Sequence, residues 1–249
     1  MGKKDMKSDF KKTDDFYRIR AMRHNYSKTH IMSSTLFLQR CHEIEKSKKS
    51  KYPDVFFWHN AYVINSIFST VAFLESYINE FFSNSMDVPQ LLGREIPKKE
   101  LSRIQAIWGL GIPRTASHPI LEKYQIALIL TDNEPFTNQD SMGQKIKTIT
   151  KLRNELIHFE PRWIDVFEDP EQERKKMTGV GSQLQHEKFS HNPFVAKTSP
   201  FFPNRCLGYG CAKWTYENSL DFVQMFSEKM KVPFRYREDI EDELKFYSS

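Results

Sequence analysis

Residues 151–161 hold the side chains with the clearest potential for chemistry in this sequence. Asn154 and His158 are one helical turn apart, so on a helix they share a face. Lys147 and Lys151 precede them on the same face. A histidine that titrates near neutral pH can move protons, and a nearby cation can bind a phosphate and stabilise charge that develops on it. This is a minimal set for cleaving RNA through its own 2′-hydroxyl, without a metal ion.

Arg153 lies on a different side of the same helix, about 140° from His158. The two groups can meet through the length of the arginine side chain, through a loosened last turn, or across a symmetric dimer. The structural alternative is that His158 caps the last carbonyls of the helix. Arg153 would then pair with an acidic neighbour: Glu75, Glu155 or Glu160. Spacing alone favours this structural alternative.

Helices must position these residues, and the sequence predicts an all-α protein. Glycine is scarce, with 9 residues, and apolar residues recur at steps of three and four. The predicted helices span residues 14–49, 54–84, 98–108, 117–133, 139–160 and 212–231. The first buries Tyr26, Phe37 and Cys41, and the 139–160 helix buries Leu152 and Phe159. Residues 165–211, which contain several prolines and glycines, form a long irregular insertion before the last helix.

The helix predicted at 54–84 is apolar over most of its surface, as is typical of the central element of a bundle. Residues 55–74 contain no charged side chain but six polar ones, which favours a buried core helix over a membrane span. Its aromatic residues Phe57, Trp58 and Phe73 are expected in the core. Because no apolar segment follows the first residues, we expect a cytoplasmic protein with no membrane partner.

Composition and charge indicate one ordinary folded domain over residues 1–249, with residues 1–13 disordered and residues 233–249 a peripheral tail. The net charge is +5, and residues 1–50 carry thirteen basic and six acidic side chains. That excess suits a polyanionic partner such as RNA, or simply a solvated surface. The 3 cysteines show no Cys-x-x-Cys spacing, so no disulfide framework, metal site or other cofactor is expected.

Several segments resemble HEPN domains. The Arg-Asn-x-x-x-His pattern formed by Arg153, Asn154 and His158 at a helix end resembles the signature of that family. Residues 72–80, Ala-Phe-Leu-Glu-Ser-Tyr-Ile-Asn-Glu, are similar to an earlier HEPN helix that carries an acidic residue. The segments 121–125 and 206–214 resemble parts of uncharacterised bacterial proteins of this type, so the resemblance covers roughly residues 55–230.

This resemblance implies an up-and-down HEPN-like helical bundle that forms a homodimer and brings two Arg/His motifs to one cleft. Many HEPN domains are metal-independent endoribonucleases of toxin–antitoxin or phage-defence systems, so RNA and an antitoxin or defence-system protein are the implied partners. His158 would be the general acid or base, and Arg153 would stabilise the phosphorane-like transition state. Asn154 would position the phosphate or the histidine, and Glu75 would orient Arg153.

Three further residues are predicted to contact RNA: Lys147, Lys151 and, as a weaker addition, Asn79, one turn after Glu75. The alternative function is a non-catalytic HEPN-like module that binds a nucleotide, RNA or a partner protein. The long 165–211 insertion motivates this alternative, because a minimal nuclease would not need it.

Overall fold

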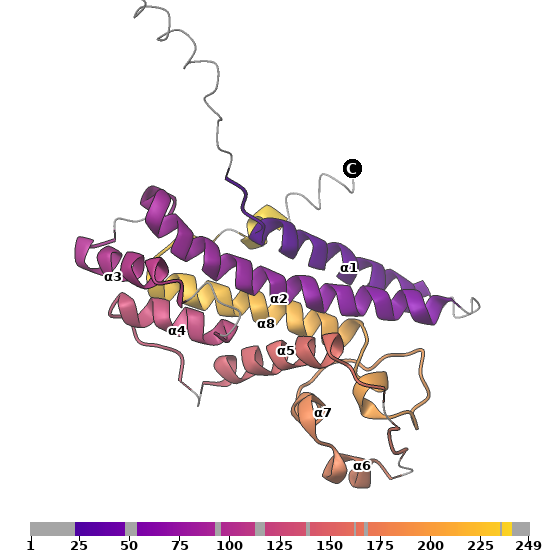
Figure 1. Ribbon diagram of the computed structural model, residues 1–249. Coiled ribbons are helices and arrows are strands. Elements are labelled where there is room, and N and C mark those ends of the chain that lie inside the picture. The colour runs from indigo at the N-terminus through magenta and orange to yellow at the C-terminus, as the bar shows by residue number, and fades with distance from the viewer. Residues whose placement is uncertain are drawn as a thin grey trace, which may run out of the picture.

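The computed structural model of the chain describes residues 23–47, 54–92, 96–112, 118–137, 140–161, 163–166, 169–234 and 236–240. Every regular element in these ranges is helical, and the longer helices pack side by side as a bundle (Figure 1). The prediction of an all-α bundle is therefore confirmed for the described part of the chain.

The bundle is built on three long helices, α1, α2 and α8, with α3, α4 and α5 packed against α2 and its neighbours (Figure 1). The long helices are α1 (Ser27–Ser47), α2 (Val55–Asp87) and α8 (Tyr209–Met230). The shorter ones are η1 (Pro89–Leu92), α3 (Lys98–Gly109), α4 (Ile120–Leu130), α5 (Ser141–Ile157), α6 (Pro170–Lys176), α7 (Gly179–Leu184) and η3 (Phe201–Arg205).

Helices α1 and α2 run antiparallel and meet through small polar residues. The Ser34 hydroxyl lies 2.6 Å from the Thr70 hydroxyl and donates to the Ser66 carbonyl at 3.0 Å. All three side chains are buried, so these hydrogen bonds satisfy groups that would otherwise lose their contact with water. Small side chains at this point of the interface let the two helices approach closely.

Helix α2 is the centre of the bundle, with α8 running parallel to it. The Tyr77 hydroxyl of α2 lies 2.8 Å from the Ser227 hydroxyl of α8, and Phe226 of α8 packs against both Tyr77 and Tyr124 of α4. Among the described residues, α2 is the one helix long and apolar enough to cross a membrane by length and composition. In this structure its apolar surface is covered mainly by α1 and α8.

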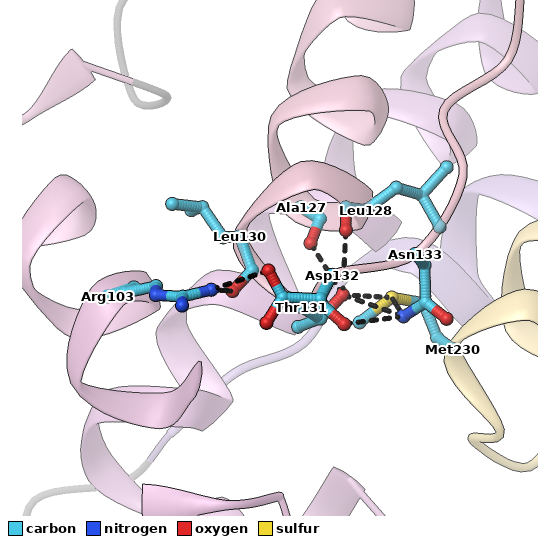
Figure 2. Close-up of polar contacts among 8 residues, drawn as sticks. All are labelled: Arg103, Ala127, Leu128, Leu130, Thr131, Asp132, Asn133 and Met230. Carbon is cyan, nitrogen blue, oxygen red and sulfur yellow. Dashed lines mark hydrogen bonds and ion pairs between the residues drawn. The ribbon is translucent and has the colours of Figure 1, made fainter. Parts of the chain in front are cut away.

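The end of α4 is joined to both α3 and α8 by polar contacts (Figure 2). The Arg103 guanidinium of α3 pairs with Asp132 at 2.9 Å. The Thr131 hydroxyl donates to main-chain carbonyls of the last α4 turn and accepts from the Asn133 side-chain amide at 2.8 Å. Asn133 also lies 3.7 Å from the sulfur of Met230 at the end of α8. These contacts stop α4 and fix its position between its neighbours.

The insertion predicted at 165–211 is more ordered than expected, because it contains α6, α7 and η3. An ion pair between Glu173 and Arg205 links α6 to η3, and the Phe201 amide donates to Glu173 at 2.6 Å. The last helix begins at Tyr209, three residues earlier than predicted. Buried apolar residues such as Val180, Leu184 and Phe201 also anchor this segment. Its helices have only 7, 6 and 5 residues, too few to show a periodic apolar stripe in the sequence.

The structure corrects the prediction for the first helix. Helix α1 begins at Ser27, whereas the prediction began at residue 14; residues 14–22 lie outside the described residues. Cys41 is buried as expected, but Tyr26 is exposed and Phe37 is only partly buried. The core face instead combines Ile31 and Leu38 with small polar residues, which an apolar periodicity cannot identify.

Three other expectations about burial are wrong. Phe57 and Trp58 expose 71% and 61% of their surface, whereas Phe73 is fully buried. Phe159 is 37% exposed, because α5 ends two residues before it. The 233–249 segment is not wholly peripheral: Ile240 is buried, and Tyr236 packs on Tyr77. Residues 1–13 and 241–249 lie outside the described residues.

We predict that Gly210→Ala destabilises the fold. A Cβ at Gly210 would lie 2.3 Å from the Ser190 carbonyl oxygen, so the main chain of the insertion would have to move. The expected loss is about 1–3 kcal/mol in the free energy of unfolding, measured by chemical denaturation. Gly109→Ala is the matched control, because nothing lies within 4 Å of its Cβ position and alanine favours a helix by up to about 1 kcal/mol. Equal stability of the two variants would contradict this close approach.

Candidate functional site

Helix α5 presents one apolar and one polar face at the proposed site. Ile146, Ile149 and Leu152 are fully buried against the bundle, while Lys147 and Asn154 are exposed and Lys151 is partly buried. The predicted basic, polar face therefore faces outward, where a polyanion can reach it. 

His158 is the residue that ends α5. Its backbone has left the helical region, with φ −102° and ψ 30°, and its amide donates to the Asn154 carbonyl at 2.9 Å. The side chain is exposed, and no hydrogen bond or ion pair holds it within the described part of the chain. An imidazole at this position is near the negative end of the helix dipole and open to a substrate proton.

Arg153 is drawn toward α2 by Glu75. A guanidinium nitrogen, Nη2, lies 3.9 Å from Glu75 Oε2, and the two side chains are 26% and 35% exposed. At this distance the contact is an ion pair without a hydrogen bond, so it leaves donors of Arg153 for another acceptor. The structure thus pairs the two residues that the resemblance placed together.

Glu75 has a second and closer partner that the sequence analysis missed. The Lys123 ammonium of α4 donates to Glu75 Oε1 at 2.8 Å and lies 3.5 Å from Asn79 Oδ1. Lys123 is fully buried, so Glu75 supplies the counter-charge that this ammonium needs. The sequence did hold a signal for the burial of Lys123, because this residue stands between the apolar residues Leu121 and Tyr124, which are both buried.

The cluster of Lys123, Glu75 and Arg153 carries two positive charges and one negative charge. Glu75 uses one oxygen for each cation, which sets the guanidinium at the outer edge of the cluster. The excess positive charge and the partly exposed arginine suit binding of a phosphate oxygen.

The structure does not bring all predicted site residues together. Arg153 points to α2 and His158 lies beyond the end of α5, with no contact between them. Asn79 is near Lys123 and lines an open groove of about 600 Å³, together with Arg23 and Trp108. Its nearest polar partner is thus the Lys123–Glu75 pair, not the exposed face of α5.

Comparison with protein-family models, curated proteins and solved structures finds no match to this chain. The resemblance to HEPN domains therefore remains a prediction that rests on the sequence segments themselves.

We predict that Glu75→Gln destabilises the protein by about 2–3 kcal/mol, because it removes the counter-charge of a buried ammonium while Glu75 itself is partly solvated. Chemical denaturation measures the loss. Adding Lys123→Met should recover much of it, since the double variant buries no uncompensated charge. Glu122→Gln, an exposed carboxylate on the same helix as Lys123, is the control and should cost less than about 1 kcal/mol. If Glu75→Gln costs no more than this control, Glu75 does not compensate Lys123.

Proposed function

We propose that this protein is a metal-independent endoribonuclease of HEPN type, acting as a toxin or phage-defence effector. The observation that carries the proposal is the placement of Arg153. Glu75, itself neutralised by buried Lys123, holds the guanidinium at the surface of the helix whose end exposes His158. A phosphate ligand and a proton carrier thus lie on one element, next to exposed Lys147 and partly buried Lys151.

The proposed reaction is an attack of an RNA 2′-hydroxyl on the adjacent phosphorus. A new bond forms between the 2′-oxygen and phosphorus, and the bond to the 5′-oxygen of the next nucleotide breaks. His158 accepts the proton of the 2′-hydroxyl or, when protonated, donates one to the leaving oxygen. Arg153 stabilises the charge on the non-bridging oxygens, and Asn154 positions the phosphate or the imidazole. The products are a 2′,3′-cyclic phosphate and a 5′-hydroxyl.

A second copy of the chain would complete the site. Within one chain Arg153 and His158 do not meet. A second copy would also bring a second imidazole, so that one histidine accepts the 2′-hydroxyl proton while the other donates a proton to the leaving 5′-oxygen. Exposed apolar side chains lie close to His158 in the sequence: Ile157 is 49% exposed, and Trp163 is fully exposed. A symmetric dimer that covers these side chains would place two histidines and two arginines in one cleft.

We predict that His158→Ala lowers RNA cleavage by about 10²–10⁴-fold, the usual contribution of general acid–base catalysis. The assay follows cleavage of labelled single-stranded RNAs with chelator present, and it identifies the cyclic-phosphate end. His186→Ala removes another exposed histidine and should cleave as the wild type does. The proposal fails if the wild-type protein leaves varied RNAs intact, or if His158→Ala cleaves as well as the wild type.

A second function, RNA binding without turnover, is favoured by one observation. Arg153 is paired with Glu75 and not with His158. A single chain therefore has the basic surface needed to bind RNA but lacks the Arg–His pair needed to cleave it. A non-catalytic module would use the same exposed face of α5. The two functions differ in turnover and share the binding surface.

We predict that the double charge reversal Lys147→Glu/Lys151→Glu weakens RNA binding by about tenfold or more and reduces its dependence on salt, because each lost cation removes a phosphate contact. Binding is measured by fluorescence anisotropy at several salt concentrations. Lys98→Glu/Lys99→Glu changes the net charge equally on the exposed start of α3 and should bind nearly as the wild type does. Equal weakening in both variants would show that only net charge matters, and that α5 is not the RNA-binding face.

A further inference from the structure

Three helices meet around one carboxylate at the end of the bundle opposite to α3. Glu45, near the end of α1, accepts the Tyr209 amide of α8 at 2.7 Å through Oε1. The same oxygen lies 2.8 Å from Nε2 of His59 on α2. Cys41, one turn before Glu45, has its sulfur 3.8 Å from that oxygen. A thiol, a carboxylate and an imidazole are therefore gathered at one point.

This cluster is enclosed by the protein. Cys41 and His59 are fully buried, and the Glu45 side chain is only 13% exposed. Gly208 lets Glu45 and Asn192 lie close to the main chain before α8, because a Cβ there would lie 3.2 Å from Glu45 Oε1 and 2.9 Å from the Asn192 Cα. The His59 ring is held by its contact with Phe194 and has no polar partner at Nδ1 among the described residues. Among the described residues, its polar contact is therefore made through Nε2, which is directed at Glu45.

The donor atoms match those of a zinc site. Cys41 Sγ, the Glu45 carboxylate and a ring nitrogen of His59 all lie within 4.8 Å of one another. Zinc takes thiolate, imidazole and carboxylate ligands at about 2.0–2.3 Å, which places neighbouring ligand atoms roughly 3.3–3.6 Å apart in a tetrahedron. The contact between Glu45 and His59 would need to widen by about half an ångström, which small side-chain rotations supply.

We propose that Cys41, Glu45 and His59 bind a zinc ion at the junction of α1, α2 and α8, with a water molecule as fourth ligand. On binding, the Cys41 thiol loses its proton to solvent, and its sulfur donates an electron pair to the metal. His59 coordinates through Nε2, and Glu45 through a carboxylate oxygen. The Tyr209 amide continues to donate to Glu45 and orients it, as outer hydrogen bonds do in metal sites.

This ion shares no residue with the Arg153 and His158 site. It joins the α1–α2 pair to the start of α8, so binding stabilises the folded chain and not the RNA-cleaving step. No metal was expected from the sequence because the cysteines lack a paired spacing. Here a single cysteine combines with a carboxylate one turn later and with a histidine of the next helix.

The test uses the full-length protein, freed of metal with a chelator and titrated with cobalt(II) as a spectroscopic probe for zinc. We expect one equivalent to bind, with a sulfur-to-cobalt charge-transfer absorption that zinc then displaces. Cys41→Ser should lose this absorption. Cys206→Ser, which alters another fully buried cysteine, should keep it. Zinc should also raise the melting temperature of the wild type.

His59→Gln is a second variant that keeps the cysteine. Removing a residue that only hydrogen-bonds a metal ligand typically lowers metal affinity by about 10–100-fold. Removing the ligand His59 itself should therefore lower cobalt affinity by more than tenfold. The proposal is overturned if wild-type protein shows no thiolate absorption with cobalt, or if Cys41→Ser or His59→Gln binds cobalt as the wild type does. In that case the cluster is a hydrogen-bonded junction centred on Glu45.

Discussion

The bundle is organised around a lysine ammonium that is wholly removed from water. A charge in this position is tolerated only beside an opposite charge, and Glu75 of α2 is the carboxylate that Lys123 of α4 contacts. This requirement fixes how α4 sits on α2. The second oxygen of the same carboxylate turns toward Arg153 of α5, so the packing of three helices and the placement of the proposed phosphate ligand depend on one side chain.

Much of the fold could be predicted from the sequence, because long periodic apolar segments are a strong signal. Helices α2 to α5 and α8 were located to within a few residues, and the ion pair of Arg153 with Glu75 was among the partners considered. The core face of α1 could not be predicted. Its core face combines apolar residues such as Ile31 with small hydroxyl-bearing side chains such as Ser34, and the pairing of these hydroxyls depends on how the two helices dock.

Only those residues of the candidate site that lie on a single helix could be predicted from the sequence. The residues of α5 follow from their spacing, but Lys123 enters through the way α4 packs, which no local pattern encodes. The cluster of Cys41, Glu45 and His59 was missed for the same reason. Its members come from two helices, and their meeting depends on Gly208, whose missing side chain leaves room for a carboxylate.

The order of the helices along the chain has a consequence for how the protein is made on the ribosome. Helices α1 and α2 are neighbours in sequence and can pair early, but α8, which covers much of the apolar surface of α2, is synthesised last. About 120 residues separate the end of α2 from the start of α8. At a translation rate of about 5–20 residues per second, the α8-binding surface of α2 therefore stays uncovered for roughly 6–25 seconds. During that time the nascent chain exposes a long hydrophobic helix, the kind of segment that chaperones protect from aggregation.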